Sequence, residues 1–249
     1  MSEELKDDLS NYNKDAYEKP SVTVDIGICC ISDNKLKVLL IQRSKPPFRD
    51  HWAIPGGFLD VGRVVDHSTG EVKEPDPSLE FAAFRELKEE TSVQGIPVHQ
   101  LKTYGDINRD PRMRVITVAY FAVVNDELMQ GVTVEAGDDA RKGSAIWWDM
   151  DELPPLAFDH AQILSDLRER IQGRIQYTDL AFQFLPKEFT WTELQNVYEI
   201  ILKKKLIASN FRRKIKSVYD IEDLKKTKET EVGRPAKLLA YKGQKPLFF

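Results

Sequence analysis

The chain has 249 residues, of which 41% are hydrophobic and 31% are charged. This length suits two domains rather than one small domain, and the composition excludes a disordered chain. The longest apolar runs, such as residues 118–124, are far shorter than the roughly 20 residues that cross a bilayer, and the acidic, polar N-terminus lacks the features of a secretory signal. The only cysteines, Cys29 and Cys30, are adjacent, which excludes a disulfide scaffold and a cysteine-based zinc finger. We therefore expect a cytoplasmic protein with no membrane partner.

Charge divides the chain into two parts. Residues 190–249 hold 14 Lys or Arg and 7 Asp or Glu, so this tail carries +7. Because the whole chain carries −4, the first 189 residues carry −11. A basic module joined to an acidic body indicates a polyanionic partner, although a solvated basic surface explains the charge equally well.

Hydrophobic patterns predict an α/β layer fold in residues 21–155, after a flexible leader of residues 1–20. Residues Ser21–Ile31 alternate with many β-branched side chains, and a turn at Asp33 and Asn34 joins them to a second strand, so the two strands should pair as a hairpin. The predicted elements after the first strand are a strand at Leu36–Gln42, a helix at Ser78–Glu90, and strands at Arg114–Val124 and Ser144–Asp149.

A second group of elements follows Pro155. Residues 156–188 are predicted to form a linker helix, capped by Asp159 with Gln162 completing a capping box, and able to pack against a second copy of itself. Helices at Thr192–Lys205 and Ser209–Val218 then precede a hairpin over Lys228–Tyr241. Two short helices and a hairpin in residues 189–249 have the order of a small α+β winged helix-turn-helix domain.

The predicted helix at Ser78–Glu90 contains a cluster of acidic side chains in the sequence RELKEET, residues 85–91. Glu86, Glu89 and Glu90 are three and four residues apart, so they share one helix face and repel one another. A divalent cation would offset this repulsion, since Mg²⁺ takes carboxylates together with phosphate oxygens. An ordinary charged helix surface remains the alternative.

The wider segment from Gly57 to Val93 resembles the Nudix box, with Gly57 at the first glycine and residues 85–90 at the core. This resemblance implies an α/β/α sandwich that splits nucleoside diphosphates linked to another moiety. It also implies that Glu86, Glu89 and Glu90 hold Mg²⁺ or Mn²⁺ and that Arg85 steadies a carboxylate.

Three departures from the Nudix box leave hydrolysis open. The box has a Glu eight residues before the Arg, where this chain has Pro77 with Asp76 beside it. About a dozen extra residues, Arg63–Glu74, precede the helix, and Ser92 stands at the final glycine. Because a missing carboxylate weakens metal binding and water activation, we expect weak, residual or absent turnover.

Residues Asp106–Arg112 resemble the loop before a strand in ADP-ribose-type Nudix proteins. Two arginines beside a turn suit a diphosphate, which a guanidinium binds bidentately, although a simple surface turn is the alternative reading. The predicted nucleotide-binding residues are Arg43, Phe58, Arg109 and Arg112.

Residues 209–218 form a basic amphipathic pattern. On a helical wheel, Phe211 and Ile215 fall in one narrow arc, with Arg212, Arg213 and Lys216 roughly opposite. Such a helix suits the major groove, and Ser209 could cap it and touch a phosphate. The predicted DNA-binding residues are Ser209, Asn210, Arg212, Arg213, Lys214, Lys216, Arg234 and Lys237.

The tail resembles the DNA-binding half of the Nudix-related transcriptional regulators of NAD metabolism, at residues 189–198 (FTWTELQNVY), 210–214 (NFRRK) and 233–238 (GRPAKL). The connector at residues 155–160 (PLAFDH) is similar too. This resemblance implies a homodimer on a palindromic double-stranded DNA operator, with ADP-ribose or a similar nucleotide as effector. We therefore expect a repressor of NAD or related nucleotide and sugar genes. A Mg²⁺-dependent ADP-ribose pyrophosphatase whose tail serves dimerisation, and a protein-binding adaptor, remain alternatives.

Overall fold

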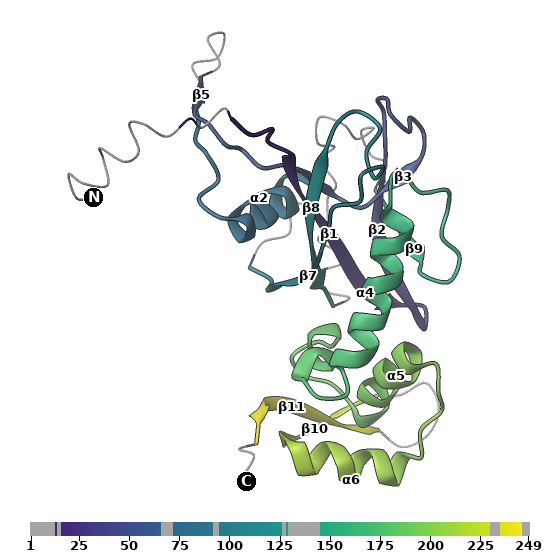
Figure 1. Cartoon of the computed structure of the whole chain (residues 1–249). Helices are drawn as coiled ribbons and strands as arrows, with labels where there is room; N and C mark the ends of the chain where they lie inside the picture. The colour runs from purple at the N-terminus through teal and green to yellow at the C-terminus, as the bar shows by residue number, and fades with distance from the viewer. Residues whose placement is uncertain are drawn as a thin grey trace, which may run out of the picture.

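The computed structural model describes residue 13 and residues 16–65, 72–91, 95–125, 128, 145–229 and 235–245. It has an upper lobe built on a mixed sheet and a smaller lower lobe of helices and a hairpin, with helix α4 running from one to the other (Figure 1). No helix in this described part is both long and apolar enough to cross a membrane.

The sheet is centred on β1, which runs over Ser21–Ser32. β1 pairs antiparallel with β2 through a turn at Asp33 and Asn34, both at positive φ, so the predicted hairpin is confirmed. On its other side β1 pairs parallel with β8 along nine residue pairs. The path through the sheet is β3-β2-β1-β8-β7, with β4 on β1 and β9 on β2. The remaining strands are β2 (Lys35–Gln42), β3 (Trp52–Ala53), β4 (Gly56–Phe58), β7 (Val98–Tyr104), β8 (Val115–Val123) and β9 (Ile146–Asp149).

A helix covers each face of the sheet, which gives the expected α/β/α sandwich (Figure 1). Helix α2 (Leu79–Thr91) buries Ala82, Ala83 and Leu87 on one face. Helix α4 (His160–Arg174) buries its own stripe on the other face. The adjacent Cys29 and Cys30 are free and buried on opposite faces, because successive side chains of a strand point in opposite directions.

Close packing of α4 depends on Gly27 in the middle of β1. A Cβ atom added at Gly27 would lie 2.3 Å from Cδ2 of Leu167, so only glycine lets the helix approach this closely. Leu167 is fully buried in the same core.

The segment inserted before α2 contains a short hairpin in its described ends. β5 (Val64–Val65) pairs antiparallel with β6 (Val72–Lys73). An ion pair between Arg63 and Glu74, at 3.1 Å, closes the base of this hairpin.

The lower lobe has the winged helix order that the tail predicts. It contains a 3-10 turn η1 (Asp179–Phe184), α5 (Trp191–Leu202), α6 (Ala208–Val218), β10 (Tyr219–Lys228) and β11 (Ala236–Gln244). Thr190 and Glu193 form a capping box at the start of α5. Lys203 follows the last residue of this helix and adopts the left-handed backbone conformation. β10 begins directly after α6, well before the predicted start of the hairpin at Lys228.

The two lobes share one apolar core. The cluster that contains Leu167 of α4 continues through Phe182 of η1 to Phe211 of α6. Two polar contacts reinforce this junction: Lys203 lies 2.6 Å from the Asp151 carboxylate, and the Gln172 amide donates to the carbonyl of Ile201 at 2.9 Å.

Two predicted helix caps are wrong. Asp159 occupies the N-cap position of α4, but its side chain makes no cap bond because Arg109 binds the carboxylate, and the Gln162 amide donates to Asp166 instead. α6 begins at Ala208 with Ile207 at the N-cap, so Ser209 lies inside the helix rather than capping it.

Candidate functional site

A pocket opens at the edge of the upper lobe, where β1, β4, the 105–114 loop and the start of α4 meet. All four predicted nucleotide-binding residues line it: Arg43, Phe58, Arg109 and Arg112. Three residues that the sequence did not single out for this site also line it: Asp25, Phe158 and His160. The pocket therefore joins residues from five separate segments of the chain.

Arg112 is positioned between the two aromatic rings of the pocket. Its guanidinium carbon lies 5.7 Å from the ring centre of Phe58 and 5.7 Å from that of Phe158. Asp110 accepts two hydrogen bonds from this guanidinium, at 3.0 and 2.8 Å. Burial acts to raise the pKa of Asp110, but the bonds from Arg112 outweigh it and the pKa lies below the ordinary 3.8. Arg43 also lies over the Phe158 ring, 5.0 Å from the ring centre. The pocket thus presents cations and aromatic faces side by side, as a nucleotide requires.

A buried polar network forms the floor of the pocket around Arg109. The Arg109 guanidinium donates two hydrogen bonds to Asp159, at 3.0 and 2.9 Å, and lies 3.5 Å from Asp25. The Thr117 hydroxyl donates to Asp25 at 2.7 Å. Arg109 is 7% exposed, so the predicted diphosphate ligand is present but already paired with carboxylates.

His160 completes this network in its neutral form. The amide of Ile54 donates to its Nδ1 at 2.9 Å, so Nε2 carries the proton and faces Asp25 at 3.7 Å. Burial lowers the pKa of His160 below the ordinary 6.5. The neutral histidine therefore lies beside Asp25 without adding a charge to the network.

The acidic helix is organised by Arg85. The guanidinium donates two hydrogen bonds to Asp76, at 3.0 and 2.8 Å, and further bonds to Glu86 at 2.7 Å and Glu89 at 3.3 Å. The hydrogen bonds that Arg85 donates to Asp76 are the largest cause of the raised pKa of Arg85. Asp76 thus supplies a carboxylate beside the place where Pro77 departs from the Nudix box.

Gly57 brings the backbone against this cluster. A Cβ atom at Gly57 would lie 2.3 Å from Oε1 of Glu86, so the carboxylate needs the glycine. Glu86 is 7% exposed and faces inward.

The described side chains do not form a metal site. Within the described residues, no group of three His, Cys, Asp or Glu side chains could hold a metal ion. Glu86 and Glu89 both accept hydrogen bonds from the same arginine, which offsets their charge. The side chain of Glu90 lies outside the described residues. The predicted Mg²⁺ or Mn²⁺ role of Glu86, Glu89 and Glu90 therefore stays a prediction.

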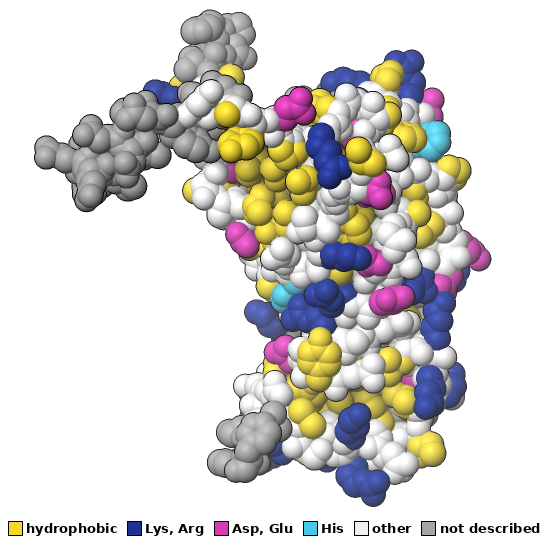
Figure 2. Space-filling view, viewed as in Figure 1, with side chains coloured by type: hydrophobic (Ala, Val, Ile, Leu, Met, Phe, Trp, Pro, Cys, Tyr) yellow, Lys and Arg dark blue, Asp and Glu magenta, His cyan; other side chains and the backbone are white. Residues whose placement is uncertain are grey.

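α6 presents the cations that the tail sequence predicts on its exposed surface. Phe211 and Ile215 are buried, whereas Ser209, Asn210, Arg212, Arg213, Lys214 and Lys216 are exposed. Arg212 and Lys216 lie over the Trp191 ring, at 5.8 and 5.6 Å, which orients both side chains. None of the four α6 cations forms an ion pair with a carboxylate of the described residues. Dark blue side chains accordingly mark the lower end of the molecule (Figure 2).

Most lysines of the hairpin are paired instead, although Lys225 forms no ion pair within the described residues. Lys226, Lys237 and Lys242 lie 2.7–2.9 Å from the carboxylates of Glu188, Asp223 and Glu222. Lys237, a predicted DNA contact, is thus exposed but partnered, and the predicted Arg234 lies outside the described residues. The positive charge of the tail that is free of carboxylates therefore concentrates on α6.

Both halves of the chain match known families. The NUDIX domain profile matches residues 22–167, and the profile of the NrtR DNA-binding winged helix domain matches residues 181–241. The chain is 34% identical to the ADPR responsive transcriptional repressor NtrR of Acinetobacter baylyi, over 94% of this chain and 86% of that protein. It is 38% identical to an ADP-ribose pyrophosphatase of Methanocaldococcus jannaschii, over 65% of this chain and 79% of that protein.

Solved structures of Shewanella oneidensis NrtR are similar along most of the chain. The complex with a 27mer DNA is 33% identical with a TM-score of 0.70, and covers 89% of this chain and 93% of that one. The NUDIX domain bound to ADP ribose is 34% identical with a TM-score of 0.52, and covers 69% of this chain and 99% of that one. With both its Nudix domain and its winged helix domain matched, the chain belongs to the Nudix family and to the branch of it that carries an NrtR-type DNA-binding domain.

Proposed function

We propose that this chain is a transcriptional repressor that binds double-stranded DNA through α6 and releases it when ADP-ribose or a similar nucleotide enters the Nudix pocket. The observation that carries the proposal is the exposed face of α6, whose four cations have no carboxylate partner in the described structure. Cations left free in this way are the groups that neutralise phosphates. The repressor of A. baylyi and the DNA complex of S. oneidensis NrtR support this assignment.

The pocket suits ADP-ribose chemistry. Phe58 and Phe158 offer faces for a base, and Arg112 and Arg43 offer guanidinium groups for a diphosphate. The ADP-ribose complex of the S. oneidensis NUDIX domain supports this ligand class. The regulated genes would be those of NAD or related nucleotide and sugar metabolism.

A homodimer would place two copies of α6 on a palindromic operator, since two-fold symmetry in the protein matches two half-sites in DNA. In this arrangement residues 21–155 act as sensor, residues 156–188 as linker and residues 189–249 as DNA-binding domain. A nucleotide that shifts α4 would change the spacing of the two recognition helices and lower the affinity for the operator.

A second candidate function is ADP-ribose hydrolysis, which the pyrophosphatase of M. jannaschii favours. Asp76, Glu86 and Glu89 converge on Arg85 as an ordered acidic cluster. Because the described carboxylates already share one arginine, we rank this function second. Release of AMP from ADP-ribose in Mg²⁺, lost in Glu90→Gln, would establish it.

The deciding experiment is fluorescence anisotropy of DNA from upstream of this protein's own operon, titrated with the full chain at fixed salt. ADP-ribose is then added at saturating protein. Tight binding that the nucleotide reverses establishes the repressor. The absence of binding at any nucleotide concentration, at low salt, would overturn it.

A further inference from the structure

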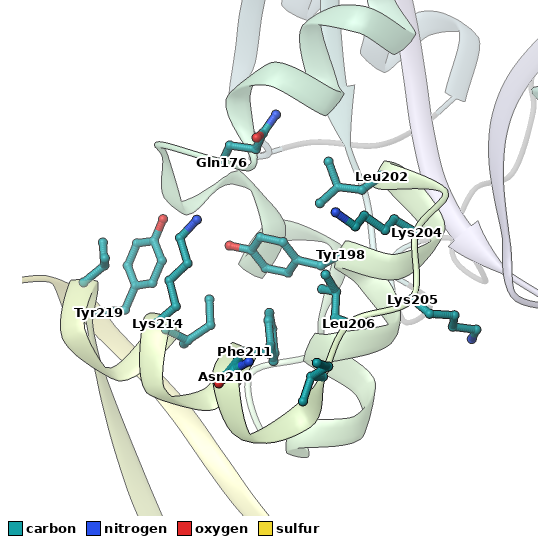
Figure 3. Close-up of a pocket in the computed structure, with 13 residues that line it drawn as sticks. Gln176, Tyr198, Leu202, Lys204, Lys205, Leu206, Asn210, Phe211, Lys214 and Tyr219 are labelled. Carbon is teal, nitrogen blue, oxygen red and sulfur yellow. The ribbon is translucent and has the colours of Figure 1, made fainter.

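A second cavity lies in the lower lobe, apart from the nucleotide pocket. It is open to solvent on one side, has a volume of about 380 Å³ and is lined by α5, the 203–207 turn, α6 and Gln176 just after α4 (Figure 3). This size is within the ordinary range of small-molecule sites, roughly 300–1,000 Å³. We propose that this cavity binds a small apolar monoanion, of the class of medium-chain or aromatic carboxylates.

The inner wall is apolar. Leu202 and Leu206 line it from α5 and the turn, and Phe211 and Ile215 line it from the buried face of α6. Figure 3 shows Leu202, Leu206 and Phe211 around the same space. At the mouth, Ile207 is 70% exposed, so a large aliphatic side chain is left in water at the rim. An apolar ligand body would cover this surface.

The polar groups gather along one side of the cavity. The Tyr219 hydroxyl donates to the carbonyl of Thr178 at 2.6 Å, and Tyr198 hydrogen-bonds with Tyr219. Burial raises the pKa of Tyr198, so both phenols stay neutral and are fixed as a polar edge. The ammonium ends of Lys214 and Lys204 lie on this same side in Figure 3.

The charge of the lining selects an anion. Neither Lys204 nor Lys214 forms an ion pair within the described residues. Lys205 is different, since it lies 2.8 Å from Glu199 and points away from the cavity in Figure 3. No Asp or Glu belongs to the described lining, which disfavours a cationic ligand. No Arg belongs to it either, so the bidentate groups that suit a diphosphate are in the other pocket.

Occupancy would reach one cation of the DNA-binding helix directly. Lys214 lines the cavity and is also one of the four exposed cations of α6. A carboxylate held at Lys214 would neutralise that cation. The winged helix domain would thus have a ligand site of its own, in addition to the nucleotide pocket of the upper lobe.

The test is calorimetric titration of the full chain with decanoate, below the concentration at which it forms micelles, against decanol and decylamine. We expect one decanoate per chain, with decanol bound about tenfold more weakly because it lacks the charged contact. The variant Lys204→Met/Lys214→Met keeps the apolar stems and should bind decanoate no better than decanol. The matched control Lys205→Met should behave as the unchanged protein.

Methyl shifts in NMR spectra locate the ligand. Leu206 and Ile215 should shift on adding decanoate, whereas Leu87 in the upper lobe should not. The proposal is overturned if decanol binds as tightly as decanoate. It is also overturned if Lys205→Met loses as much decanoate affinity as the double variant, or if the methyl shifts are confined to the upper lobe. These measurements use no DNA, so they fail or succeed independently of the repressor assignment.

Discussion

Replacing Arg212 and Arg213 with alanine removes two of the four α6 cations that have no carboxylate partner in the described structure. Both side chains are exposed, and only Arg212 contacts an aromatic ring, that of Trp191 at 5.8 Å. An exposed contact of this kind contributes about 0.5–1 kcal/mol, so the variant should keep its fold. DNA binding, by contrast, should lose two phosphate contacts in each chain, which makes four in the proposed homodimer.

The size of this loss follows from counterion release. Each phosphate contact contributes about 0.9 to the slope of log affinity against log salt, so four lost contacts should reduce the slope by about 3.6. Raising the salt from about 50 to about 200 mM should therefore weaken the unchanged protein about 150-fold more than the variant.

Anisotropy at four salt concentrations measures both slopes. The matched control is Lys226→Ala/Lys242→Ala, which removes the same charge from lysines that pair with Glu188 and Glu222. The control should leave the slope nearly unchanged. If both double variants reduce the slope equally, net charge rather than the α6 face binds the DNA, and the assignment of α6 is refuted.

Three further changes test the pocket, the core and the winged helix. Arg112→Gln should weaken ADP-ribose binding about tenfold or more in calorimetry, because a charged hydrogen-bond donor is lost. DNA affinity without nucleotide should stay the same, and an equal loss of both affinities would contradict the assignment of Arg112 to nucleotide binding. Leu167→Ala should lower the free energy of unfolding by about 2–5 kcal/mol in urea titrations, since it leaves a cavity under α4, and a loss below about 1 kcal/mol would refute the tight packing at Gly27. Burial acts to raise the pKa of Glu193, but hydrogen bonds with Lys228 and Thr190 outweigh it and the pKa lies below 4.5. The ionised Glu193 carboxylate therefore stabilises the fold at pH values above its pKa in the unfolded chain, and this stabilisation is lost as the pH falls through its lower pKa in the folded protein. The urea midpoints at about pH 7 and about pH 3 should accordingly differ less in Glu193→Gln than in the unchanged protein.

Local hydrophobic patterns predicted those strands and helices whose apolar residues are the ones buried in the folded chain. The alternation in Ser21–Ile31 correctly gave a strand, and the turn at Asp33 and Asn34 gave the hairpin, because both depend on neighbouring residues only. An alternating pattern is typical of a strand with one buried face, whereas β1 is covered on both faces. Two positions of β1 between the apolar residues have particular roles: Asp25 faces the nucleotide pocket, and Gly27 makes room for α4.

Contacts between distant residues could not be predicted from the sequence. His160 and Asp25 meet only because α4 packs beside β1. Asp159 had the right residue type for a helix cap, but Arg109, 50 residues earlier in the chain, binds its carboxylate more strongly than the helix amides do. β7 was missed because its polar His99 and Lys102 interrupt the apolar pattern, and its pairing with β8 decides the strand.

α4 is the element through which a nucleotide could act on DNA binding. It starts beside the pocket, where Asp159 binds Arg109, and its last turn donates from Gln172 to the carbonyl of Ile201 in α5. Between these points Leu167 belongs to the core cluster that continues into the lower lobe. A close-packed core of this kind passes on a displacement instead of absorbing it. A phosphate that competes for Arg109 would release Asp159 at the first turn of α4, and the same rigid helix would carry the resulting shift to the base of the winged helix.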